Sequence, residues 1–318
     1  MRYFLKKFIS LIITLLLVSF LAFLTFQIIP GDPVTKLLGT EYTEEMAAQL
    51  RAQLGLDAPF FIRYFQWLGG FVTGDFGMSY SYSIPVTSLL SDKLPVTGLL
   101  SALAFLLVVG ISIPLGIWLA AHEDSWIDKV FTALNQIAMS IPPFFLGIMM
   151  TLVLGLTFKF FTPNNYISYT VNFWASLYYL LFPAIAIAIP KIAMTVKLLK
   201  NSIHVEYRRD YVRTAISRGS TRRRVLYTHV LRNAIIPVVT FLALTIPEIV
   251  AGSIIIEQVF TVPGLGRLLI SSILNRDFPV VCAIVMLIAA LVILMNFLAD
   301  ILYRVIDPRI RIDQEAVK

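Results

Sequence analysis

The chain has 318 residues, of which 58% are hydrophobic and 14% charged, with 26 lysines and arginines against 19 acidic residues. This composition excludes a soluble domain and indicates a membrane protein with several spans. The formal net charge of +7 does not indicate nucleic-acid binding, because the cations concentrate in one loop between apolar runs and in the two tails.

The first predicted element is a membrane span over residues 8–29. Arg2, Lys6 and Lys7 precede it, and the apolar run is long enough to cross a bilayer. It is too long for the hydrophobic region of a signal peptide and lacks a small-residue cleavage site. We therefore assign residues 1–29 to an N-terminal tail and a retained first span, with the N-terminus in the cytoplasm.

Residues 30–93 form the long polar region outside the membrane, and we expect an extracytoplasmic helical insert there. Asp32 and Pro33 can start one helix as N-cap and first residue. Thr43 can cap a second helix, which Gly55 would stop. A third, aromatic-rich helix should follow Pro59 and lie in the outer interface of the membrane.

Five further spans are predicted in the core, residues 94–306, before a cytoplasmic tail at 307–318. The apolar runs cover residues 94–121, 127–161, 173–199, 234–259 and 280–305, and Pro142-Pro143 interrupts the second of them. Residues 261–279 are expected to form an outer loop. The predicted fold is thus an all-α membrane protein with six transmembrane helices, and the excess of cations in the inner segments agrees with this topology.

The loop between the fourth and fifth spans, residues 205–233, is the most basic segment of the chain. Its arginines are Arg208, Arg209, Arg213, Arg218, Arg222, Arg223, Arg224 and Arg232. A basic loop between two spans should face the cytoplasm.

Two short helices are predicted within this loop. One helix would carry a narrow apolar stripe formed by Tyr207, Tyr211, Val212, Ala215 and Ile216. Gly219 would end it, because glycine adopts the left-handed conformation without strain. Ser220 or Thr221 could cap the next helix, which would run through Val230. Two helices at a glycine elbow would make a docking surface for a cytosolic partner.

The segment resembles the coupling loop of ABC importer permeases, whose general pattern is E-A-A-x3-G-x9-I-x-L-P. The same spacing here joins Arg213, Thr214, Ala215, Gly219, His229, Leu231 and Arg232. These substitutions are the form typical of the dipeptide, oligopeptide and nickel permease subfamily. By this resemblance the coupling loop would also include Asp210, Tyr211 and Asn233.

Further motifs agree with that subfamily. They are Pro30-Gly31-Asp32-Pro33 after the first span, Pro263-Gly264-Leu265-Gly266-Arg267 between the last two spans, and the C-terminal Asp307-Pro308-Arg309-Ile310-Arg311. The resemblance therefore runs nearly from end to end.

The resemblance implies a permease subunit in a prokaryotic cell membrane, with both termini cytoplasmic. Its partners would be a homologous second permease, two cytosolic ABC ATPases, an extracytoplasmic substrate-binding protein and membrane lipid, but no nucleic acid. ATP and magnesium would be bound by the ATPases, and this chain would hold no cofactor. The carried solute could be a peptide, nickel or another small molecule.

Lys191 and Glu248 are candidates for the translocation path, because ionisable groups within spans are costly and commonly functional. Each follows a proline, and the two lie in neighbouring predicted spans. Ideal helices separate them by roughly 9 Å along the membrane normal, so they either pair directly or occupy separate water-exposed positions. Glu257, at the outer end of the fifth span, is compatible with a position facing water.

The residues give no indication of an enzyme. The chain lacks a G-x4-G-K-[ST] phosphate-binding loop, and its single cysteine and three histidines do not have metal-site spacing. A self-sufficient secondary transporter or channel is the main alternative, although no inverted repeat is evident. A membrane-embedded hydrolase is a weaker one, because no Ser/His or His/Glu constellation is present.

Overall fold

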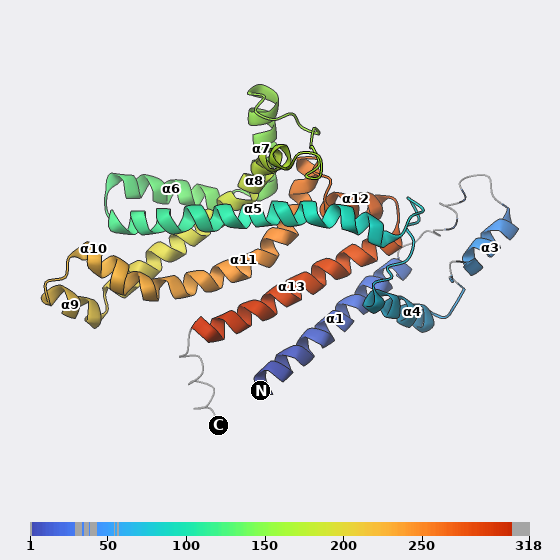
Figure 1. Ribbon diagram of the computed structural model, residues 1–318, viewed down its shortest axis with the longest axis horizontal. Helices are drawn as coiled ribbons and strands as arrows, with labels where there is room; N and C mark the ends of the chain where they lie inside the picture. Colours follow the sequence, from blue (N-terminus) through green and yellow to red (C-terminus); the bar gives the residue numbers. More distant parts are fainter. Residues whose placement is uncertain are drawn as a thin grey trace. The chain divides into compact units, whose positions relative to one another are not determined.

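The computed structural model describes residues 2–28, 43–53 and 57–306, together with residues 34, 38 and 55. The motif at Pro30–Pro33 and the tail at 307–318 lie outside the described residues. The elements within them are helices (Figure 1). They are α1 (Arg2–Ile28), α3 (Glu44–Gln53), α4 (Phe60–Thr73), α5 (Val86–Ala121), α6 (Trp126–Ser140), α7 (Pro143–Met150), the π-helix η1 (Thr151–Thr157), α8 (Phe173–Tyr207), α9 (Asp210–Ser217), α10 (Arg222–Val225), the π-helix η2 (Leu226–Val230), α11 (Leu231–Val259), α12 (Leu265–Leu274) and α13 (Phe278–Ile306).

Five helices of the described chain are long and apolar enough to cross a membrane. They cover Leu5–Thr25, Val86–Ala121, Phe173–Tyr207, Arg222–Val259 and Phe278–Ile301. A sixth crossing would require α6 and the α7–η1 segment to act as one span. The all-helical class and the several spans expected from the sequence are therefore confirmed.

The interruption expected at Pro142-Pro143 divides the predicted third span into two helical segments. Trp126–Ser140 and Pro143–Thr157 are bent by 100° relative to each other. Ile141 and Pro142 have extended backbones, with ψ of 124° and 140°. Two consecutive prolines explain the break, since each removes a backbone donor and disfavours helical geometry in the preceding residue.

The chain forms two compact units, residues 1–97 with 263–294 and residues 98–262 with 295–318. In the first unit, α4 packs against α1 through aromatic rings. The Phe20 and Phe23 rings lie 5.6 Å from the Tyr64 ring between centroids. The buried hydroxyls of Ser19 and Tyr64 share a hydrogen bond of 2.8 Å. The aromatic helix predicted after Pro59 is thus present.

Residues 261–279 were expected to form a loop, but they contain the helix α12. Leu265 and Leu268 of α12 are buried in a cluster that includes Val86 from α5 and Ile284 from α13. Val86 also belongs to a helix that starts within the predicted insert rather than at residue 94. The missed helix α12 and the wrong start of α5 have the same cause. Packing between distant segments stabilises both helical regions, and local sequence signals do not reveal it.

In the same unit, the buried carboxylate of Asp277 binds the loop before α5 through hydrogen bonds. Asp277 has no exposed surface. It accepts hydrogen bonds from the Ser79 hydroxyl at 2.5 Å and from the backbone N–H groups of Tyr80 and Ser81 at 3.0 and 3.1 Å. These three bonds satisfy the charge that burial would otherwise make costly. Burial raises the pKa of the nearby Tyr80 hydroxyl, and the negative charge of Asp277 raises this pKa further.

In the second unit, α8 is the central helix and packs against α6, α7 and α11. Gly116 of α5 approaches Leu199 so closely that an added Cβ would lie 2.9 Å from the Leu199 side chain. The Tyr179 hydroxyl of α8 donates to the Phe260 carbonyl at 2.6 Å. This unit contains the basic loop and the charged residues of the spans, so the candidate site lies within one packed body.

Candidate functional site

The basic loop contains the predicted glycine elbow. The N–H of Gly219 donates to the Ile216 carbonyl at 2.9 Å, and the N–H of Ser220 donates to the Ala215 carbonyl at 3.2 Å. This pair of bonds is the Schellman arrangement that ends helices. Gly219 has φ of 83°, and an added Cβ would meet no atom within 4 Å. Glycine is therefore needed for its backbone conformation and not for space.

Thr221 caps the helix that follows the elbow. Its hydroxyl accepts a hydrogen bond from the Arg224 N–H at 3.4 Å, which selects it over Ser220 as the N-cap. The expected second short helix is not separate from the fifth span. Residues 222–259 form one continuous helical rod with a π turn at η2, because no residue between Val225 and Ala234 breaks a helix.

The apolar stripe predicted on the first helix is divided between two helices. Tyr207 ends α8, and the extended backbone of Arg209 separates it from α9. Of the remaining stripe, Val212 is buried, whereas Tyr211 and Ile216 are 37% and 48% exposed. The exposed part of α9 thus offers an apolar patch that no described residue covers.

A hydrogen-bond network holds α9 against its neighbours. The Tyr211 hydroxyl donates to Glu206 at 2.6 Å and accepts from the Asn233 amide at 3.3 Å. Partial burial, followed by the hydrogen bond to Glu206, raises the pKa of Tyr211, so its hydroxyl stays protonated at neutral pH. The network joins the end of α8, α9 and the start of α11, and it brings together two residues of the predicted coupling loop.

The other residues of the predicted coupling loop lie mostly on its surface. Exposed members are Asp210, Arg213, Thr214, His229, Arg232 and Asn233, while Ala215 and Leu231 are half-buried. The Thr214 hydroxyl donates to the Asp210 carbonyl at 3.1 Å. The Pro263, Gly264 and Gly266 motif lies elsewhere, at the start of α12 in the other unit.

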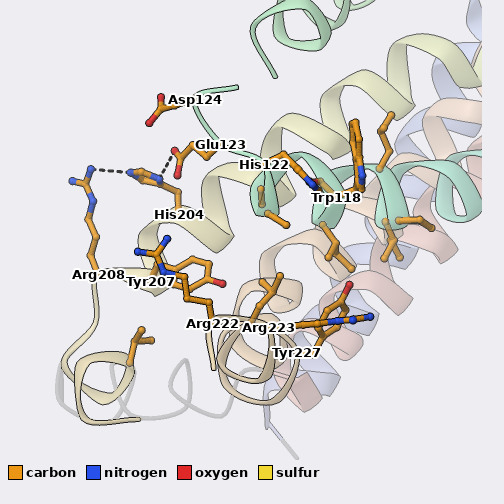
Figure 2. Close-up of a pocket in the computed structure, with 18 of the residues that line it drawn as sticks. Trp118, His122, Glu123, Asp124, His204, Tyr207, Arg208, Arg222, Arg223 and Tyr227 are labelled. Carbon is orange, nitrogen blue, oxygen red and sulfur yellow. Dashed lines mark hydrogen bonds and ion pairs between the residues drawn. The ribbon is translucent and has the colours of Figure 1, made fainter. Parts of the chain in front are cut away.

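A cavity of about 1490 Å³ opens beside the elbow (Figure 2). It is lined by the second half of α5, the α5–α6 turn, the end of α8, α9 and the first turns of the helix after the elbow. We call it the basic cavity, because Arg208, Arg213, Arg222 and Arg223 are among its lining residues. Glu123 and Asp124 are the acidic residues in the lining. The sequence alone did not indicate this cavity, since its walls come from segments far apart in the chain.

One histidine at the edge of the basic cavity has a defined tautomer. The Nδ1 atom of His204 lies 2.7 Å from a Glu123 oxygen, and its Nε2 atom lies 2.8 Å from the Arg208 guanidinium. A guanidinium only donates hydrogen bonds, so Nε2 accepts and Nδ1 carries the proton that is donated to Glu123. Figure 2 shows both contacts, through which the histidine ring links Glu123 to Arg208.

Lys191 of α8 and Glu248 of α11 form an ion pair. The contact expected as one of two alternatives is therefore confirmed. Their side chains are 18% and 58% exposed. Pro190 and Pro247 precede them inside their helices, and α8 packs along α11, so two helices with proline irregularities bring the opposite charges together.

The structure also locates two other carboxylates, of which Asp128 was not singled out from the sequence and Glu257 was expected to be compatible with a position facing water. Asp128 of α6 is buried and accepts two hydrogen bonds from Lys200 of α8, at 2.6 and 2.7 Å. The separation of 72 residues in the chain follows no spacing rule that could have indicated this pair. Glu257 does not face water but has no exposed surface.

Comparisons with known proteins agree over most of the chain. Residues 112–312 match the family model of the binding-protein-dependent transport system inner membrane component, and residues 1–102 match its N-terminal companion model. The oligopeptide transport system permease protein AppB of Bacillus subtilis (strain 168) is 35% identical over 97% of this chain and 98% of its own length. The dipeptide transport system permease protein DppB of Escherichia coli (strain K12) is 32% identical over 98% of this chain and 99% of its own.

The fold is similar to that of a chain in a solved ABC transporter. A chain from an inward-facing crystal form of the MetNI methionine ABC transporter aligns with a TM-score of 0.55 and 18% identity. The alignment covers 69% of this chain and 96% of that one.

Proposed function

The chain belongs to the family of binding-protein-dependent transport system inner membrane components and is a membrane permease of an ABC importer, and from that premise we propose that its importer carries short peptides. The names of the two relatives, an oligopeptide permease and a dipeptide permease, support this cargo. Nickel is the other cargo of the subfamily that the coupling-loop form resembles.

We propose that the importer contains two homologous permeases, two cytosolic ATPases that bind ATP and magnesium, and an extracytoplasmic binding protein. ATPases and a binding protein are general partners of this family. The surface that would receive an ATPase in this chain is α9, whose Tyr211 and Ile216 are exposed while the Schellman turn and the Tyr211 network fix its position. That exposed helix at a rigid elbow is the observation that carries the proposal.

Topology follows from the charge distribution and from counting crossings. The N-terminal cations and the basic loop should both face the cytoplasm, so an even number of crossings must separate them. Helices α1, α5 and α8 provide three. The bent α6–α7–η1 segment must then supply the fourth, which gives six crossings in the whole chain and places residues 30–93 outside and the C-terminal tail inside.

The continuous helix from residue 222 to residue 259 suggests how movement is transmitted. Closure of the ATPases would displace α9 and the elbow. Because the helix after the elbow carries Glu248 on the same rod, displacement at the cytoplasmic end would be transmitted toward the Lys191–Glu248 region through the π turn η2 and Pro237. Alternation between two packings of α8 and α11 would then open the path to either side.

The Lys191–Glu248 pair is proposed to line the translocation path. A carboxylate that is 58% exposed in the middle of a span is too costly to place against lipid. It must therefore face either water or another polypeptide. In a permease formed by two chains, both conditions are met along the central path.

The experiment is to purify the chain alone and together with its second permease, ATPases and binding protein in proteoliposomes. The complete importer should take up labelled di- and tripeptides with ATP hydrolysis, and the isolated chain should hydrolyse no ATP because it has no phosphate-binding loop. Uptake of Ni²⁺ but not peptides would overturn the cargo alone. Uptake by the isolated chain in response to an ion gradient would favour a secondary transporter and overturn the whole assignment.

A further inference from the structure

The basic cavity combines an apolar wall with an arginine rim. Ile111, Ile117 and Trp118 of α5 contribute to the wall, and Ile111 and Trp118 are 43% and 40% exposed. Arg213, Arg222 and Arg223 lie along the side formed by the elbow. An occupant that fits both parts must have an apolar body and an anionic end.

The arginines of the rim are available to an anionic ligand. Arg208 is already bonded to His204, but Arg213 and Arg223 make no ion pair or side-chain hydrogen bond with any described residue. Arg222 and Arg223 also stand in the first turn of a helix, where the helix dipole is unfavourable to cations. A bound anion would interact favourably with the helix dipole and would reduce the electrostatic repulsion among the arginines.

The apolar wall belongs to a helix that crosses the membrane, since Gly110–Ala121 is the last third of the α5 span. A spanning helix of this length reaches the inner leaflet, where acyl chains are available. Basic pockets between transmembrane helices on the cytoplasmic side are known to suit phospholipid headgroups. We propose that the basic cavity binds an anionic phospholipid, with its phosphate on Arg213, Arg222 and Arg223 and an acyl chain along α5.

Such a lipid would touch both the α5 wall and the coupling elbow, so the lipid composition of the inner leaflet would influence the position of α9. The acidic Glu123 and Asp124 lie at the α5–α6 turn, and Glu123 is held by His204. The anionic headgroup is therefore expected on the elbow side of the cavity. This inference does not depend on which solute the importer carries.

The test uses the complete importer in nanodiscs that contain phosphatidylglycerol or phosphatidylcholine with a photoreactive group on the acyl chain, at equal mole fraction. Adducts are quantified by mass spectrometry on residues 110–121 and, as an internal control, on residues 130–137 of α6, where Leu134 and Ile137 are 54% and 56% exposed. Phosphatidylglycerol should label residues 110–121 by a factor of at least about five more than phosphatidylcholine does, since each engaged arginine favours anionic lipid by about that factor. Labelling of residues 130–137 should not differ between the two lipids.

Matched variants test whether the lipid preference comes from the arginines that line the cavity or from the total positive charge of the basic loop. The double variant Arg222→Gln/Arg223→Gln should abolish the preference for phosphatidylglycerol. The double variant Arg218→Gln/Arg224→Gln removes the same charge from arginines that do not line the cavity and should preserve it. Inorganic phosphate, compared with chloride at equal ionic strength, should not reduce the labelling, because it lacks the acyl chain.

Three results would overturn the inference. Equal labelling of residues 110–121 by both lipids would show that no anionic headgroup is selected. An equal loss of preference in the two double variants would show that loop charge, not the cavity, is responsible. Unchanged labelling in Arg222→Gln/Arg223→Gln, together with lost ATPase co-purification, would assign these arginines to the ATPase instead.

Discussion

The two charged regions of the second unit are built in opposite ways. In the basic loop, Arg213 and Arg223 make no ion pair with any described residue, which costs little because water solvates them. In the spans, Lys191 and Glu248 are bonded to each other, because an unpaired charge among apolar helices is expensive. The loop therefore keeps charge and apolar surface available to other molecules, whereas the span pair is neutralised within the chain.

The largest effect is expected from a change in the elbow that leaves all charges in place. Gly219→Val forces a β-branched residue to φ of 83°, at a cost of roughly 1–2 kcal/mol or more. Because nothing surrounds the position, the strain should rotate α9 and not disturb the packing of the spans. ATP-driven uptake at equal membrane abundance should fall by about ten-fold, the change that corresponds to about 1.4 kcal/mol.

Gly219→Asn is the matched control for this prediction. Asparagine tolerates the left-handed conformation better than valine does, so this variant should retain most of the uptake. Wild-type uptake by Gly219→Val would show that the elbow conformation is not required for coupling.

The next largest effect is expected from breaking the pair in the spans. Lys191→Met and Glu248→Gln should each lower uptake several-fold, because either change leaves the other charged group without its partner in an apolar region. The double variant should recover part of the activity, since no unpaired charge remains. Uptake and membrane abundance are measured together in all three variants. Losses that simply add in the double variant would mean that the two residues act independently, despite their contact.

The smallest effect is expected at the N-cap after the elbow. Thr221→Ala removes the hydroxyl that accepts from the Arg224 N–H and should destabilise the first turn by about 1 kcal/mol. Faster amide hydrogen exchange at residues 222–225 is the measurement, with a modest fall in uptake. Thr221→Ser should restore slow exchange, and Ser220→Ala should have no effect. An equal response in Ser220→Ala would contradict the choice of Thr221 as the cap.

The comparison also explains which features could be predicted from the sequence. The elbow depends on residues close in the chain, so the local pattern around Gly219 was enough to indicate the turn and to limit the cap to Ser220 or Thr221. Thr43 was predicted in the same way, and its hydroxyl accepts from the Met46 N–H at 3.3 Å. The presence of opposite charges after two prolines likewise indicated that Lys191 and Glu248 could meet, although ideal helices placed them at different depths.

Features that depend on packing between distant segments were not predicted. Helix α12 exists because its leucines are buried with residues of α5 and α13, and nothing in residues 265–274 alone distinguishes it from an apolar loop. The Asp128–Lys200 pair and the basic cavity arise from how α5, α6 and α8 lie together. The sequence also did not reveal that the helix after Thr221 continues into the fifth span. The only local sign of such a continuous helix is that no helix-breaking residue interrupts it.

The most direct test of the account is where an ATPase touches this chain. A photoreactive amino acid is placed at Thr214, which is exposed on α9 and does not line the basic cavity, or at Trp174, which is 75% exposed at the start of α8, and the assembled importer is irradiated. We expect a covalent adduct with an ATPase subunit from position 214 and none from position 174. An adduct from position 174, or none from position 214 in an importer that hydrolyses ATP normally, would contradict the assignment of α9 as the docking surface.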